Sequence, residues 1–190
     1  MPEPTGTIIV SLGKALVELL RTKAGFAEGD IVLKSPVEAD QAGKISLFLY
    51  QVQENPHLRN RELEPIHDSD LRPPPLTLDL YYLVTPLSQQ SETALGHLEA
   101  VMLAFYDQPT LKPPLLGATL LDAGNDSVQI MAQALTLEDT NRLWGIFPNK
   151  PYRLSVAYLV TPVRVPSSRL IPITRVKERV ARISRLGERM

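Results

Sequence analysis

The 190-residue sequence contains no cysteine, which excludes disulfide bonds and thiolate metal ligands. Its three histidines, His57, His67 and His97, are not spaced from one another as metal-binding pairs are. No apolar run reaches the roughly 18 residues that a membrane-spanning helix needs. The first residues also lack the basic region of a secretory signal. We therefore expect a protein that is cytoplasmic when it is synthesised.

Catalytic motifs are missing as well. The glycine patterns that bind dinucleotides or phosphates do not occur, and neither does the Gly-x-Ser-x-Gly motif of a nucleophilic serine. An acidic stretch around Asp68 and Asp70 lacks the glycine and the last glutamate of a calcium loop. Trp144 and Phe147 flank the end of a predicted helix and fit packing better than a ligand platform. We predict that the protein is not an enzyme and has no cofactor and no metal site.

Two segments of the chain are nearly alike: residues 78–86 (LDLYYLVTP) and residues 154–162 (LSVAYLVTP). Both are rich in β-branched and aromatic residues, which predicts two well-buried strands. Both reach a Thr-Pro, and because proline cannot donate to a β-ladder, each strand is expected to stop there. We expect the two strands to lie together near the centre of a sheet. Their flanking sequences differ, so a duplicated domain is not indicated.

The remaining elements follow from local patterns. Apolar residues at 3.6-residue spacing predict helices over residues 8–21, 88–106 and 137–146. The expected N-caps of these helices are Thr7, Ser88 or Ser91, and Thr136. Further strands are predicted over residues 30–33, 44–53 and 127–134, and the strands that contain the two similar segments are predicted over residues 76–85 and 152–165.

Three segments between these elements have their own predictions. Residues 40–43 form a turn. Residues 115–121 fit either a short strand or a half-buried loop. Residues 54–75 are polar and rich in proline, which predicts a long, stiff loop. The fold class is therefore α+β: a mixed, largely antiparallel β-sheet packed by helices, with an extended basic C-terminal arm or helix.

Charge divides the chain unevenly. We assign residues 1–165 to the α+β domain and residues 166–190 to a basic C-terminal arm. Residues 164–190 hold eight basic and two acidic residues, a net charge of +6, although the whole chain has a net charge of −1. On a helical wheel, residues 175–189 separate into an apolar arc and an adjacent basic arc. The apolar arc contains Val176, Val180, Ile183 and Leu186, and the basic arc contains Arg175, Arg179, Arg182, Arg185 and Arg189.

Three roles are open for the arm: packing on its own domain, docking on an acidic protein surface, or binding nucleic acid or a membrane surface. An acidic body and an arm without aromatic residues argue against nucleic acid. Residues 169–174 (RLIPIT) fit addition to the edge of another sheet, because an edge strand tolerates proline. The candidate partner-contact residues are Arg169, Ile171, Ile173, Arg175, Arg179, Arg182 and Arg185 in the arm, and Asp68, Asp70 and Arg72 in the loop.

Four stretches of the chain carry a family resemblance by their order and spacing: SLFLYQV (46–52), NPHLRN (55–60), PLTLDLYYLVT (75–85) and PYRLSVAY (151–158). Together they resemble the N-terminal domain family of cap, or tube-terminator, proteins of phage-tail-like contractile injection systems of the antifeeding-prophage type. The resemblance extends over residues 8–165. It implies a structural protein that forms a ring, a hexamer, on the end of an inner tube and anchors the last sheath layer.

The partners implied by this resemblance are further copies of the chain, the inner tube protein and the sheath protein, in a particle that is retained or released. The basic arm would reach the sheath or a neighbouring subunit, and residues 54–75 would contact the tube or a neighbouring subunit. Two alternatives remain. One is a tail-terminator or head-tail joining protein of a phage, and the other is a small enzyme with a dispersed site.

Overall fold

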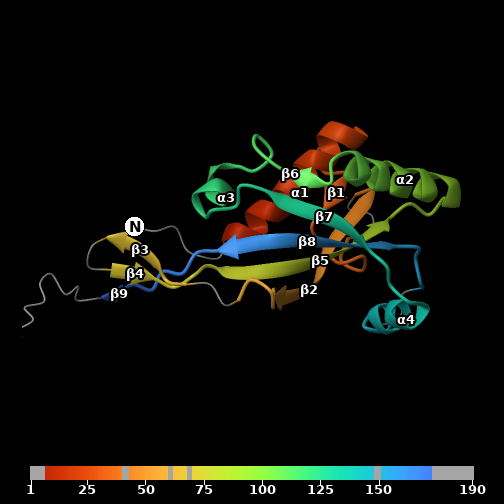
Figure 1. Ribbon diagram of the computed structural model, residues 1–190. Coiled ribbons are helices and arrows are strands. Elements are labelled where there is room, and N and C mark those ends of the chain that lie inside the picture. The colour runs from red at the N-terminus through yellow and green to blue at the C-terminus, as the bar shows by residue number, and fades with distance from the viewer. Residues whose placement is uncertain (1–6, 40–42, 60–61, 68–69, 148–150, 173–190) are drawn as a thin grey trace, which may run out of the picture.

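The computed structural model of the chain describes residues 7–39, 43–59, 62–67, 70–147 and 151–172 (Figure 1). Its described elements follow the chain in this order: α1 (Ile8–Ala24), β1 (Ile31–Val32), β2 (Ile45–Glu54), β3 (Glu64–His67), β4 (Asp70–Arg72), β5 (Leu76–Pro86), α2 (Ser91–Asp107), β6 (Thr110–Leu111), α3 (Ala118–Asp122), β7 (Val128–Gln133), α4 (Leu137–Gly145), β8 (Val156–Val165) and β9 (Ile171–Pro172). The predicted α+β class is confirmed.

A six-stranded sheet forms the body, in the order β1-β2-β5-β8-β7-β6. All neighbouring strands are antiparallel except β1 and β2, which are parallel. The two near-identical segments lie in β5 and β8, which pair with each other in the middle of this sheet, as predicted. The body is therefore built around the two strands that the sequence repeats.

Alternation along β5 separates two buried layers. Leu80, Tyr82 and Val84 belong to the main core together with the apolar stripe of α1 and the inner face of α2. The benzene ring of Phe105 in α2 lies 4.8 Å, centroid to centroid, from the ring of Tyr158 in β8. Burial in this core raises the pKa of Tyr82 to about 12. Helices α1 to α3 cover this face of the sheet, and α4 lies on the other side (Figure 1).

The second layer, beneath α4, is smaller. Trp144 and Phe147 at the end of α4 are buried, and their rings meet edge to face at 5.5 Å. Phe147 also contacts Phe48 of β2, and Trp144 contacts Tyr152, at ring distances of 5.9 and 5.5 Å. The prediction that Trp144 and Phe147 serve packing is confirmed. These rings fix α4 and the start of the chain segment that leads into β8.

A smaller three-stranded sheet, which we call the ribbon, extends from one end of the body and has the order β3-β4-β9 (Figure 1). Both of its strand pairs are antiparallel. The prediction that residues 54–75 form one long loop is wrong for the residues of β3 and β4. The strands could not be predicted locally, because β4 takes its outer partner, β9, from the far end of the chain.

The second Thr-Pro does not end its strand, which is a further correction. β5 does end at Pro86, but β8 continues through Pro162 to Val165. The register between the strands shifts here, so that Asp79 of β5 lies opposite both Thr161 and Pro162. Such a β-bulge leaves one residue outside the ladder, and Pro162 therefore interrupts the strand without ending it.

Two smaller predictions are also corrected. Residues 115–121 contain the start of the short helix α3, neither a strand nor a loop throughout. The N-cap of α2 is Gln90, not Ser88 or Ser91. Thr7 is the N-cap of α1, as predicted, although its side chain makes no capping hydrogen bond. Of the predicted turn at residues 40–43, positions 40–42 lie outside the described residues.

Candidate interaction surfaces

The ribbon brings together predicted contact residues that are far apart in the sequence. Asp70 pairs with Pro172, and Leu71 pairs with Ile171, one hundred residues further along the chain. Arg72 stands opposite Glu64 on the other side of β4. The segment that was predicted to join another protein's sheet thus pairs first with a strand of its own chain.

The other predicted contact residues are placed as follows. Arg169 is exposed just before β9, and its backbone N–H donates to Ser167 Oγ over 3.2 Å. Six predicted residues lie outside the described ranges: Asp68, Ile173, Arg175, Arg179, Arg182 and Arg185. The role of the whole set in partner contact therefore stays a prediction.

A buried carboxylate joins the body to the segment that leads toward the ribbon. Asp79 Oδ1 accepts hydrogen bonds from Asn55 Nδ2, at 2.9 Å, and from the hydroxyl of Thr161. The side-chain oxygen of Asn55 in turn accepts from the backbone N–H groups of His57 and Leu58, at 3.0 and 3.2 Å. This network holds the turn after β2 against the paired central strands. Asn55 and Asp79 both come from the stretches that carry the family resemblance.

A second polar contact fixes the end of β8, from which the ribbon strand β9 continues. The buried Asn125 side chain donates from Nδ2 to the backbone oxygen of Arg164 at 2.9 Å. Its Oδ1 accepts from the backbone N–H of Arg164 at 2.7 Å. The Arg164 guanidinium donates to the backbone oxygen of Gly124 at 2.6 Å. The direction in which the chain leaves the body is therefore set by the loop after α3.

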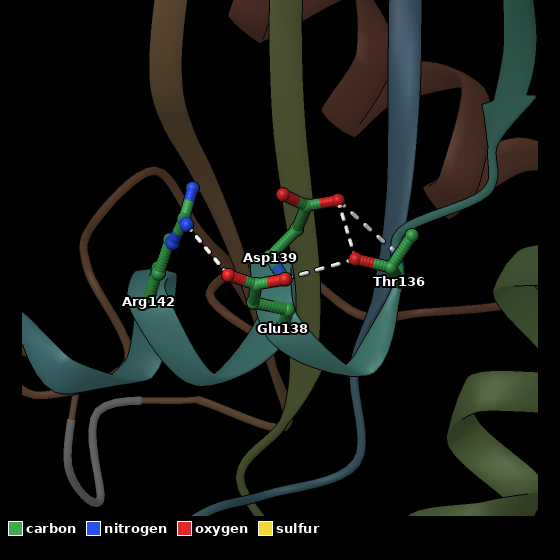
Figure 2. A network of polar contacts seen from close by, with 4 residues as sticks. All are labelled: Thr136, Glu138, Asp139 and Arg142. Atoms are coloured by element: carbon green, nitrogen blue, oxygen red, sulfur yellow. Dashed lines mark hydrogen bonds and ion pairs between the residues drawn. The ribbon is translucent and has the colours of Figure 1, made fainter.

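The N-terminus of α4 carries a complete capping box (Figure 2). The Thr136 hydroxyl accepts from the backbone N–H of Asp139 at 3.1 Å and donates to Asp139 Oδ2 at 2.7 Å. Figure 2 also shows the ion pair of Glu138 and Arg142, one turn apart, at 2.6 Å. Donation from the Thr136 hydroxyl lowers the pKa of Asp139 below its usual value. The polar and charged groups at this helix terminus thus form their hydrogen bonds and ion pairs with one another, which is typical of a terminus with a structural role.

Helix α2 presents an apolar groove that the sequence analysis did not anticipate. We call groove the hollow of about 900 Å³ between α2, β7 and the start of β8. Its wall is formed by Leu95, Met102, Leu103 and Tyr106 of α2, all of them exposed. Glu99 is the one charged residue among those that line it. An exposed apolar surface with a polar rim is typical of a protein interaction site.

The sequence contained a signal for this groove that the sequence analysis did not use. Leu95, Leu98, Val101, Met102 and Phe105 lie at helical spacing, which was used only to predict the helix. The structure buries Leu98, Val101 and Phe105 and leaves Leu95 and Met102 on the surface. An apolar stripe that is too wide for one buried face was the sign that α2 has two contact surfaces.

Within the described ranges, no group of three or more histidine or acidic side chains is arranged to hold a metal ion. The helices of these ranges include none that is long and apolar enough to cross a membrane. Apart from Glu99, the groove is lined mainly by apolar side chains, whereas the rival enzyme hypothesis calls for a polar pocket with converging acids.

Comparison with known proteins adds the decisive observation. The family model of the Pvc16 N-terminal domain matches residues 11–178. The chain belongs to this family. No curated protein matches the chain. The resemblance stated for the four sequence stretches is confirmed.

Two solved structures share the fold. One is the sheath/tube terminator of PVC, an extracellular contractile injection system, in the extended state, with 22% identity and a TM-score of 0.65 over 94% of this chain. The other is the tube-terminating cap of the anti-feeding prophage, with 23% identity and a TM-score of 0.67 over 92% of this chain. This chain spans 65% and 61% of the lengths of those two proteins.

Proposed function

We propose that this member of the Pvc16 N-terminal domain family is a structural cap of a contractile injection system. In this role it ends the inner tube and anchors the last sheath layer of a phage-tail-like particle. The observation that carries the proposal is the shared fold, over almost the whole of this chain, with one sheath/tube terminator and one tube-terminating cap. Its partners are the inner tube protein, the sheath protein and further copies of itself, and it performs no catalysis.

The architecture supports a structural role. The central strands β5 and β8 are buried on both faces. Hydrogen bonds of the Asp79 and Asn125 side chains hold the segments that lead to the ribbon against the body of the domain. Because a symmetric ring repeats each contact in every subunit, contacts that are weak in one pair of subunits add up through avidity. We propose a homo-hexameric ring in which the ribbon and the C-terminal arm contact neighbouring subunits, the tube or the sheath.

The cap assignment is tested by producing the particle with and without the chain. The tube and sheath proteins of the same system are co-expressed with the full chain or without it, and tube lengths are measured by negative-stain electron microscopy. We expect tubes of regular length that carry a terminal ring and an attached sheath only when the chain is present. Tubes of the same regular length, with sheath retained, in its absence would refute the assignment.

The contributions of the ribbon and the arm are separated by two variants. Deletion of residues 68–72 removes β4 and the two residues before it, and we expect it to impair capping. Truncation after Pro172 keeps β9 and removes only the later part of the arm, and we expect a chain that still folds but no longer retains sheath. A truncated chain that holds the sheath normally would show that residues 173–190 are not the sheath anchor.

A further inference from the structure

The groove on α2 has the dimensions of a site for one short helix. Its exposed wall runs from Leu95 to Tyr106, which is about 16 Å at the α-helical rise of about 1.5 Å per residue. Ile130 and Ala132 of β7 and Tyr158 of β8 line it from the sheet side. An elongated apolar groove between a helix and a sheet is a surface that receives the apolar face of an amphipathic helix.

The chain itself supplies a segment of matching length and pattern. In residues 175–189, the apolar arc extends from Val176 to Leu186, with Val180 and Ile183 between them. As a helix, this arc is about 15 Å long. The four apolar residues thus match the groove in length and in chemical character.

Charge is complementary between the two surfaces. Helix α2 contains three acidic residues, Glu92, Glu99 and Asp107, and no lysine or arginine. The segment that would enter the groove has arginines beside its apolar arc. Arg153, the residue before Leu154 in the groove, donates from Nη1 to the backbone oxygen of Leu87 over 3.1 Å and is thereby held on its own chain.

The position of the arm decides between docking on its own chain and docking on a neighbour. Tyr158, near the start of β8, lines the groove, and the chain then runs about 23 Å along β8 to Val165 at the strand rise of about 3.3 Å per residue. It continues in the same direction into the ribbon, and Figure 1 shows β9 and α2 at opposite ends of the molecule. A short helix that follows Pro172 does not span this distance back to its own groove.

We propose that residues 175–189 of one chain bind as an amphipathic helix in the α2 groove of a neighbouring copy. Val176, Val180, Ile183 and Leu186 face Leu95, Met102, Leu103 and Tyr106, and the arginines face the carboxylates of α2. Because a tail joins a groove and not another tail, the contact can repeat from head to tail, and it closes into a ring when the rotation between successive subunits closes. The inference rests on the proposed cap only for its biological meaning and supplies the subunit contact of that ring.

Two substitutions in the full chain separate the two halves of the contact. Leu103→Lys places a positive charge in the groove at a side chain that is 56% exposed, so the core is left intact. Ile183→Asp places a charge in the apolar arc of the tail. The matched controls are Leu137→Lys, at an exposed leucine on α4 away from the groove, and Ala181→Asp, on the opposite side of the helical wheel from the arc.

Self-association of the purified chain is measured by sedimentation velocity, without tube or sheath protein. We expect Leu103→Lys and Ile183→Asp each to raise the dissociation constant about tenfold or more, since each removes a leucine or isoleucine contact and buries a charge. The controls should associate like the parent chain. Mixing the two variants should restore a complex of twice the 21.1 kDa chain mass, because only the tail of one and the groove of the other remain intact.

The mixing result also guards against misfolding, because two misfolded variants would not complement each other. A peptide of residues 173–190 should bind the Ile183→Asp chain and not the Leu103→Lys chain, as measured by fluorescence anisotropy. A parent chain that stays monomeric, variants that associate like the parent, or a mixture that forms no complex would each overturn the proposal. None of these outcomes bears on tube length, so the cap assignment stands or falls by its own experiment.

Discussion

Replacing Asn125 by alanine tests how the end of β8 is held. Strand β7 pairs with β8 only as far as Thr161, so the outer edge of β8 has no neighbouring strand at Arg164. The Asn125 amide takes the place of that strand, since it accepts from the N–H and donates to the C=O of Arg164 at 2.7 and 2.9 Å. Removal of the amide leaves both backbone groups without these partners.

The expected loss of stability follows from these two hydrogen bonds. Each contributes about 0.5–1.5 kcal/mol, and a buried polar group without a partner costs about 1–3 kcal/mol. Asn125 is 1% exposed, but Arg164 is half-buried and water can reach part of its backbone. We therefore expect Asn125→Ala to lower the free energy of unfolding by about 2–3 kcal/mol. Asn125→Asp keeps the acceptor but turns a buried carboxylate oxygen toward the C=O of Arg164, so its loss of stability should be at least as large.

Urea denaturation followed by circular dichroism measures both variants. Asp126→Ala, at the exposed neighbouring position, is the matched control and should stay within about 0.5 kcal/mol of the parent. Asn125→Ala should also make the bonds before β9 more sensitive to limited proteolysis, because the root of the ribbon strand is released. A decrease in the free energy of unfolding of less than about 0.5 kcal/mol for Asn125→Ala would show that the Asn125 amide does not hold the end of β8, and would refute this reasoning.

Three further predictions concern local contacts. Thr136→Ala removes the capping hydroxyl of α4 and should cost about 1 kcal/mol in urea denaturation; no change would mean that the capping box is dispensable. Gly43→Ala places a Cβ 2.9 Å from the backbone oxygen of Asp30 and should cost about 1–3 kcal/mol, and an unchanged melting temperature would contradict this. Lys44 Nζ donates to Asp30 Oδ2 at 2.8 Å and holds the pKa of Asp30 below 3.8. This stabilisation is complete above about pH 4 and disappears as the pH falls through the lowered pKa, so Asp30→Asn should flatten the acid side of the stability profile, whereas an identical profile would argue against the contact.

Local patterns predicted the elements whose environment is uniform along their length. Helix α1 has one apolar stripe that meets the core, and α4 has a threonine and an aspartate at capping-box spacing. The segments in β5 and β8 are apolar on both faces because both faces are largely buried, one of them in the core that includes α1 and α2. In such elements, the pattern of apolar residues within the segment indicates which of its faces are buried.

The candidate contact surfaces were predicted less completely. The ribbon residues Asp70, Arg72 and Ile171 were singled out, but their pairing in one small sheet was not, because hydrogen bonds between β4 and β9 join residues one hundred positions apart. The groove was not predicted, because an apolar residue in the sequence does not show whether its side chain is buried in the core or exposed on the surface. Leu98 and Leu103 look alike in the sequence, yet the sheet covers the first and leaves the second exposed.

The sequence by itself determined the α+β class, the central pair of strands and the charge asymmetry between body and arm. These depend on composition and on short-range periodicity, which each segment contains in full. Only the tertiary structure decided which edge β9 joins, where Asn125 meets Arg164 and which face of α2 stays open. Each of those depends on the distance between segments that are remote in the chain, and that distance is set by the packing of the whole domain.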